Sequence, residues 1–185
     1  DVLIHTGDFT QGWGRRDQVW DVAKWLGGTH HTYKFLIGGN HDGSLVKHEE
    51  QCREILGTRG IQYLLHQSAM VGDIRIWGSP YHPQFAGVFG KTFAELETLW
   101  QQVDPDVDVL ITHGPPLGIL DTDGERPDHL GDPALREMVS HWCPMIHAFG
   151  HIHGGYGRIT YGDGLSTTFY NVAVCNERYE PVNPV

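Results

Sequence analysis

Four short stretches of this 185-residue chain combine glycine with residues that can bind a metal ion or transfer a proton. They are Gly7-Asp8, Gly39-Asn40-His41-Asp42, His113-Gly114 and Gly150-His151-Ile152-His153. Carboxylate, amide and imidazole groups all bind divalent metals, and an imidazole also exchanges a proton near neutral pH. Each stretch alone is more typical of a turn or of a surface histidine. Their recurrence, each time after an apolar run, favours a metal site.

The apolar runs before these stretches are typical of buried strands that alternate with helices. Strands are expected over 2–6, 33–37, 61–65, 74–77, 107–112 and 145–149, and a hairpin over 157–161 and 168–174 around Gly162-Asp163-Gly164. Helices are expected over 16–26, over 45–56 with Ser44 as the cap, from a capping box at Thr92 to Pro105, and from Pro133 onward. This order predicts an α/β fold with largely parallel strands, in a mixed sheet or in two sheets.

The strand ends place the candidate ligands together. In open α/β sheets, ligands bind beyond the carboxyl ends of the strands, so Asp8, Asn40, His113 and His151 are expected at one edge. A set of oxygen and imidazole ligands without thiolate suits Mn, Fe, Co, Ni or Zn. An aspartate with two oxygens can bridge two ions, and the set exceeds the needs of one ion. This pattern of ligands therefore predicts a centre that binds two metal ions.

The composition and charge of the chain argue against several classes of function. The chain is 39% hydrophobic with a formal net charge of −10, which argues against a stable complex with nucleic acid. No apolar stretch approaches the length of a membrane span, so no membrane association is expected. The three cysteines, Cys52, Cys143 and Cys175, are widely spaced and form no metal-binding pair. They are expected to be reduced, and a cytoplasmic location is predicted.

The four stretches resemble motifs two to five of the calcineurin-like metallophosphoesterases. Further residues resemble the metallophosphoesterase-domain branch related to brain cyclic-nucleotide phosphodiesterases. These are Gly7 to Thr10, Gly78 to Pro83, Thr112 to Gly118, Phe149 to His153 with Tyr156-Gly157, and Tyr179 to Pro184. The resemblance spans nearly the whole chain. It implies an α/β sandwich of two mixed β-sheets flanked by helices.

The resemblance also implies roles for single residues. Asp8 would bridge two divalent ions, with Mn favoured among Mn, Fe, Zn, Co and Ni. One ion's site would be completed by Asn40, His113 and His151, and His153 would serve the other ion. His41 would be the proton donor to the leaving oxygen, with Asp42 orienting it. A turn-forming role is the alternative for Asp42.

One motif of the family is missing. Its first motif, Asp-x-His, precedes Gly-Asp on an earlier strand, and only seven residues precede Asp8 here. We therefore expect residues 1–185 to form a single metallophosphoesterase domain that is truncated at its N-terminus and lacks its first strand.

The predicted activity is hydrolysis of a phosphodiester by attack of a metal-bound hydroxide on phosphorus. The substrate would be a small phosphodiester or a nucleotide-like molecule. Tyr81 and His82 follow the break at Gly78-Ser79-Pro80 and are candidates to line the substrate cleft, with packing at its rim as the alternative. The rival functions are a phosphomonoesterase or phosphoprotein phosphatase with the same centre, and a non-catalytic scaffold with a degraded metal site.

Overall fold

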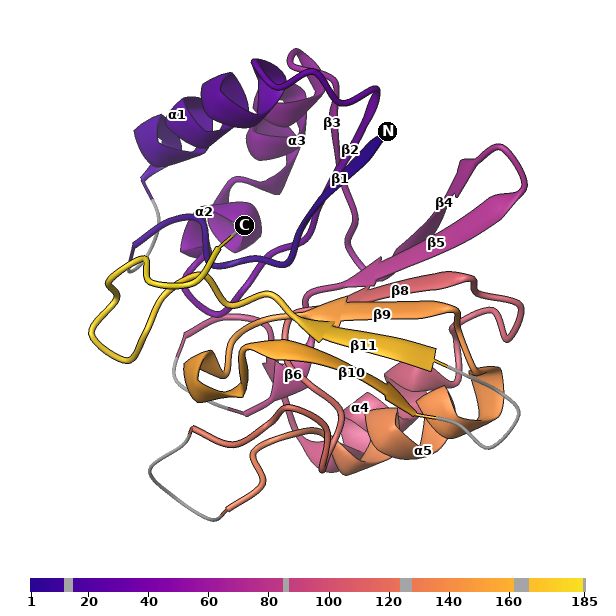
Figure 1. Ribbon diagram of the computed structural model, residues 1–185. Helices are drawn as coiled ribbons and strands as arrows, with labels where there is room; N and C mark the ends of the chain where they lie inside the picture. The colour runs from indigo at the N-terminus through magenta and orange to yellow at the C-terminus, as the bar shows by residue number, and fades with distance from the viewer. Residues whose placement is uncertain (12–14, 85–86, 124–127, 162–166, 185) are drawn as a thin grey trace.

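The described residues form two main β-sheets with helices on their outer sides (Figure 1), besides one short two-stranded pair. This computed structural model describes residues 1–11, 15–84, 87–123, 128–161 and 167–184. The smaller sheet contains β1 (Val2–His5), β2 (Tyr33–Leu36) and β3 (Ile61–Tyr63), in that order. The architecture is the α/β sandwich that the sequence predicts, although the three described strands of this smaller sheet are all parallel.

The larger sheet has six strands and is mixed, in the order β10-β11-β9-β8-β5-β4. Its bounds are Gln67–Val71 for β4, Ile74–Ser79 for β5, Val109–Thr112 for β8, Ile146–Phe149 for β9, Gly157–Tyr161 for β10 and Thr167–Asn171 for β11. The four inner strands run parallel, and the edge strands β4 and β10 run antiparallel to their neighbours. All four residues of β8 are buried, as expected for a strand covered on both faces. The turn predicted at 162–164 lies outside the described residues.

Three apolar clusters hold the layers together. The helices α1 (Arg16–Gly27), α2 (Gly43–Lys47) and α3 (Glu49–Gly57) pack on the smaller sheet, and α4 (Phe93–Trp100) and α5 (Pro133–Trp142) pack on the larger one. A third cluster lies between the sheets and includes Ile37 of one and Ile111 of the other, both fully buried. This cluster fixes the two sheets face to face.

Two local features differ from the sequence prediction. The helix expected over 45–56 is divided at His48, where the backbone is neither helical nor extended (φ −137°, ψ 41°), and it begins after Asp42 rather than Ser44. Strand β4 was missed because it contains no long apolar run and only two of its residues, Met70 and Val71, are large and apolar. Its strand conformation depends on pairing with β5, which is a tertiary interaction.

The remaining short elements are the parallel pair β6 (His82–Pro83) and β7 (Gly90–Lys91), and a 3-10 turn η1 (His153–Gly155). No helix within the described ranges has the length and apolar character needed to cross a bilayer.

Parallel pairing brings the ends of neighbouring strands side by side. At the end of β1, the carbonyl of its last residue, His5, accepts a hydrogen bond from the N–H of Ile37, which follows β2 (3.1 Å). Beyond the ends of β8 and β9, the His113 carbonyl accepts a bond from the N–H of Gly150 (2.9 Å). The four glycine-containing stretches therefore leave two sheets at neighbouring carboxyl edges.

Candidate metal centre

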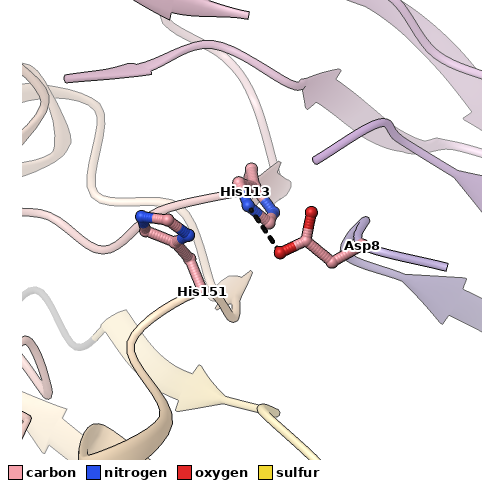
Figure 2. Close-up of side chains that lie close together, drawn as sticks. All are labelled: Asp8, His113 and His151. Atoms are coloured by element: carbon pink, nitrogen blue, oxygen red, sulfur yellow. Dashed lines mark ion pairs between the residues drawn. The ribbon is translucent and has the colours of Figure 1, made fainter. Parts of the chain in front are cut away.

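Asp8, His113 and His151 converge in the space between the two sheets (Figure 2). One ligand atom from each of the three lies within 4.8 Å of the others. Asp8 follows β1, whereas His113 and His151 follow β8 and β9, so both sheets contribute to the group. The Asp8 carboxylate points toward the His113 ring, with Oδ2 3.4 Å from Nε2.

Asn40 joins this group from the loop after β2. Its Oδ1 lies 3.1 Å from Nε2 of His113, and its backbone N–H donates to the same nitrogen at 3.3 Å. The residue is buried. The described residues thus bring together all four predicted ligands of one metal site.

The tautomer of His113 shows why this group fits a cation. Its Nδ1 lies 2.8 Å from the carbonyl oxygen of Thr6, and a carbonyl only accepts, so Nδ1 carries the proton. In the neutral ring, Nε2 therefore carries a lone pair, which accepts from the Asn40 N–H and also lies near Oδ2 of Asp8 and Oδ1 of Asn40. Three electron-rich atoms meet at this point, and a cation between them would relieve their repulsion. A ligand histidine held through its other nitrogen is typical of metal sites.

The Asp8 and His113 side chains lie so close to the backbone at position 39 that only glycine fits there. A Cβ atom there would lie 2.3 Å from Oδ1 of Asp8 and 2.5 Å from Cε1 of His113, well inside van der Waals contact. Only glycine lets the backbone pass this near to both side chains.

Asp42 connects the loops that carry Asp8 and Asn40. Its Oδ2 accepts from the backbone N–H groups of Asp8 (2.8 Å) and Gly39 (2.7 Å). Its Oδ1 accepts from the N–H and the hydroxyl of Thr10, at 2.9 and 2.8 Å. Four donors occupy this fully buried carboxylate, so in this structure it organises the loop backbone around the ligands.

The ionisable groups of the centre shift one another's pKa values. Burial alone raises the pKa of Asp8, but the nearby His113 ring and the N–H of His41 lower it below its usual range. Burial alone lowers the pKa of His113, whereas the charge and hydrogen bond of Asp8 raise it. Burial, and then the neighbouring His113 and His82 rings, lower the pKa of His151. Burial and the Asp8 charge raise the pKa of Asp42 to about 7.

His41 lies close enough to Asp8, and His153 to His151, for their charges to affect the pKa values of those two residues. The backbone N–H of His41 also donates to Oδ1 of Asp8 (2.9 Å). His153 is not within the three-residue group. Its buried Nδ1 has no hydrogen-bond partner among the described residues, and Oε2 of Glu177 lies 3.7 Å from it. An orphaned buried imidazole nitrogen is compatible with a second ion.

The two candidate substrate residues occupy different places. The His82 ring is almost fully buried, and its centroid lies 5.4 Å from the ring of His113 and 5.3 Å from that of His151. Tyr81 lies instead beside a cavity of about 390 Å³ on the face of α4, with the ammonium of Lys91 5.4 Å from its ring centroid. Substrate contact by either residue stays a prediction.

Sequence reasoning missed the segment that follows β11. Residues 176–180 place Glu177 next to His153 and Tyr179 next to both His41 and His153. The sequence signal for Tyr179 to Pro184 was only its resemblance to one branch of the family. The sequence around a loop residue has no helical or strand periodicity, so it does not predict which site the residue will contact in the folded chain.

The fold and this ligand group agree with the result of a comparison with protein families. The family model for calcineurin-like phosphoesterases matches residues 1–155, and the chain belongs to this family.

Named relatives agree with that assignment. The human and mouse proteins called metallophosphoesterase domain-containing protein 1 are each 36% identical over 211 residues, covering 100% of this chain and 63% of theirs. A UPF0046 protein of Caenorhabditis elegans is 35% identical, covering 96% of this chain and 63% of its own. A solved structure with 19% identity superposes with a TM-score of 0.64 over 85% of this chain and 63% of that one, which shows the shared fold. The chain therefore spans somewhat less than two thirds of these proteins.

Proposed function

We propose that this chain is a phosphodiesterase that depends on two divalent metal ions, with Mn²⁺ preferred. The convergence of Asp8, His113 and His151, with Asn40 at hydrogen-bond distance, is the observation that carries the proposal. Family membership supports the coarser activity, hydrolysis of phosphoric esters. The preference for diesters rests on the resemblance to the metallophosphoesterase-domain branch.

Asp8, Asn40, His113 and His151 would hold one ion, and Asp8 and His153 would contribute to a second. When bound, such ions supply positive charge to the phosphoryl oxygens and make a coordinated water more acidic. The chain itself contributes a partly buried set of side-chain atoms that can act as metal ligands. Its geometry is held by the Thr6 carbonyl behind His113 and by the carboxylate of Asp42.

His41 is proposed as the general acid. Its backbone N–H donates to Asp8, which supports the proposal that its ring faces the departing group of a bound substrate. An imidazole there can protonate the departing alkoxide oxygen, which is the most basic atom formed when the P–O bond breaks. Asp42 acts in this proposal as a positioning residue, because its carboxylate orders the backbone on both sides of His41.

The test is a hydrolysis assay on two substrates with the same leaving group. Bis(p-nitrophenyl) phosphate should be hydrolysed in the presence of Mn²⁺, and EDTA should abolish turnover. p-Nitrophenyl phosphate, the matched monoester, should be a poorer substrate by kcat/KM. A metal-loaded protein that cleaves only the monoester would favour the phosphatase alternative. Tight metal binding without turnover on either ester would favour the scaffold.

A further inference from the structure

A loop after β11 places an aromatic ring beside two histidines of the candidate site. The ring centroid of Tyr179 lies 6.0 Å from that of His41 at an interplanar angle of 87°. It lies 5.5 Å from that of His153 at 84°. These histidines come from the loops after β2 and β9, on different sheets. Tyr179 therefore spans the gap between the two sides of the site.

The base of this loop is closed by backbone pairing. Cys175 and Pro181 form an antiparallel bridge, and the N–H of Val182 donates to the carbonyl of Val174 at 3.1 Å. Figure 1 shows the segment, in yellow, as a loop between β11 and the C-terminus. The loop is thus anchored at both ends to the chain that leaves β11.

The tip of the loop is organised by Asn176. Its Oδ1 accepts from the N–H of Arg178 (2.9 Å) and of Glu180 (3.0 Å), and its N–H donates to the Glu180 carbonyl (2.9 Å). Tyr179 has a φ of 60°, a left-handed conformation that is uncommon for a bulky side chain. The Asn176 contacts hold the backbone in this conformation, so the direction of the Tyr179 ring is set by the loop.

The Tyr179 ring remains available to a ligand. Its residue surface is 63% exposed despite both histidine contacts. An exposed ring held beside buried polar groups leaves apolar surface that another flat group can cover. Aromatic rings pair in this way with offset-stacked or edge-to-face geometry.

We propose that Tyr179 is a specificity-determining residue that favours phosphoesters whose ester group carries an aromatic or heteroaromatic ring. The inference rests on the proposed function, because it requires the phosphoryl group to bind at the metal centre. With the phosphoryl group there, an ester group that projects past His41 meets the Tyr179 ring. Alkyl esters lack the flat surface that this contact needs.

The experiment measures binding without turnover. Isothermal titration of the Mn²⁺-loaded protein compares phenylphosphonate with methylphosphonate, which share the anionic head and differ by the ring. Wild type should prefer the phenyl compound. Tyr179→Ala should reduce this preference by about 2- to 12-fold, the range that one aromatic pair contributes. Tyr179→Phe should keep it, because the ring and not the hydroxyl makes the contact.

Tyr161→Ala is the matched control, since Tyr161 is also an exposed tyrosine but lies on β10 beside Arg136. It should leave the phenyl preference unchanged. An equal preference in wild type and Tyr179→Ala, with both compounds bound, would overturn the inference and leave the proposed function intact. Failure of both phosphonates to bind the metal-loaded wild type would overturn the proposed function and the inference with it.

Discussion

At the residue scale, Asn40 and His41 are adjacent yet have separable roles. Asn40 presents its amide oxygen to the ligand group, whereas the backbone N–H of His41 donates to Asp8 and its ring lies edge-on to that of Tyr179. In the proposed function, the Asn40 side chain would bind a metal and the His41 side chain would exchange a proton with substrate.

Asn40→Ala is therefore expected to lower metal content and activity together. His41→Ala should leave metal content near normal while kcat falls by about 10²- to 10⁴-fold, the usual contribution of a general acid. Metal analysis alongside kinetics separates the two. The His41→Ala loss should shrink on substrates with p-nitrophenolate as leaving group, which departs without a proton. Equal losses on good and poor leaving groups would argue against His41 as the acid.

Gly39 provides a test of packing around the centre. Gly39→Ala forces a Cβ against Asp8 and His113, and should weaken Mn²⁺ binding by about 10- to 100-fold, as changes next to metal ligands do. Gly57→Ala is the control, because a Cβ at that position in α3 meets nothing within 4 Å. It should keep the metal affinity of wild type and raise stability by up to about 1 kcal/mol. If Gly39→Ala bound Mn²⁺ with the affinity of wild type, the backbone at position 39 could not be packed tightly against Asp8 and His113.

At the scale of elements, β8 and β9 are joined by a buried polar contact near their ends. The Thr112 hydroxyl donates to the Gly114 carbonyl (2.7 Å), so Nε2–H of His147 must donate to that hydroxyl (2.8 Å). The remaining nitrogen, Nδ1 of His147, is buried and has no hydrogen-bond partner in the part of the chain that the structure describes. Burial lowers the pKa of His147 to about 3, because a second proton there would find neither water nor an acceptor.

This histidine should make folding sensitive to acid. The unfolded chain takes up a proton on His147 near pH 6.5, whereas the folded chain resists protonation until about pH 3. Its contribution to stability is present above pH 6.5 and is lost progressively as the pH falls below that value. His147→Leu should reduce the slope of unfolding free energy between pH 6 and pH 4 by about 1.4 kcal/mol per pH unit.

Urea denaturation of wild type and His147→Leu at several pH values measures this slope. His141→Gln, on the exposed side of α5, serves as the control. An unchanged slope in His147→Leu would mean that His147 already carries a proton in the folded state or reaches solvent.

Much of the element pattern could be predicted from the sequence, because its signals are local. The capping box at Thr92 and Glu95 and the proline after Asp132 begin α4 and α5 as expected. The apolar run of β8 indicates a doubly covered strand. Features that depend on tertiary contacts were not predictable in this way. The break at His48, the strand β4 and the position of Tyr179 belong to this group.

At the scale of the whole molecule, the candidate centre belongs to neither sheet alone. Asp8 and Asn40 leave the smaller sheet, and His113 and His151 leave the larger one. The apolar cluster between the sheets sets their spacing, and the bond from His113 to the Thr6 carbonyl connects their edges. The order of ligands along the chain was visible in the sequence, whereas their division between two sheets was not.

The position of a bound metal tests this account most directly. Crystals of the protein grown with Mn²⁺ would be measured at a wavelength where manganese scatters anomalously. The account predicts a strong anomalous peak among Asp8, Asn40, His113 and His151, which disappears in crystals of Asp8→Ala grown under the same conditions. Manganese bound tightly at another place, with these four side chains in contact with no ion, would contradict it.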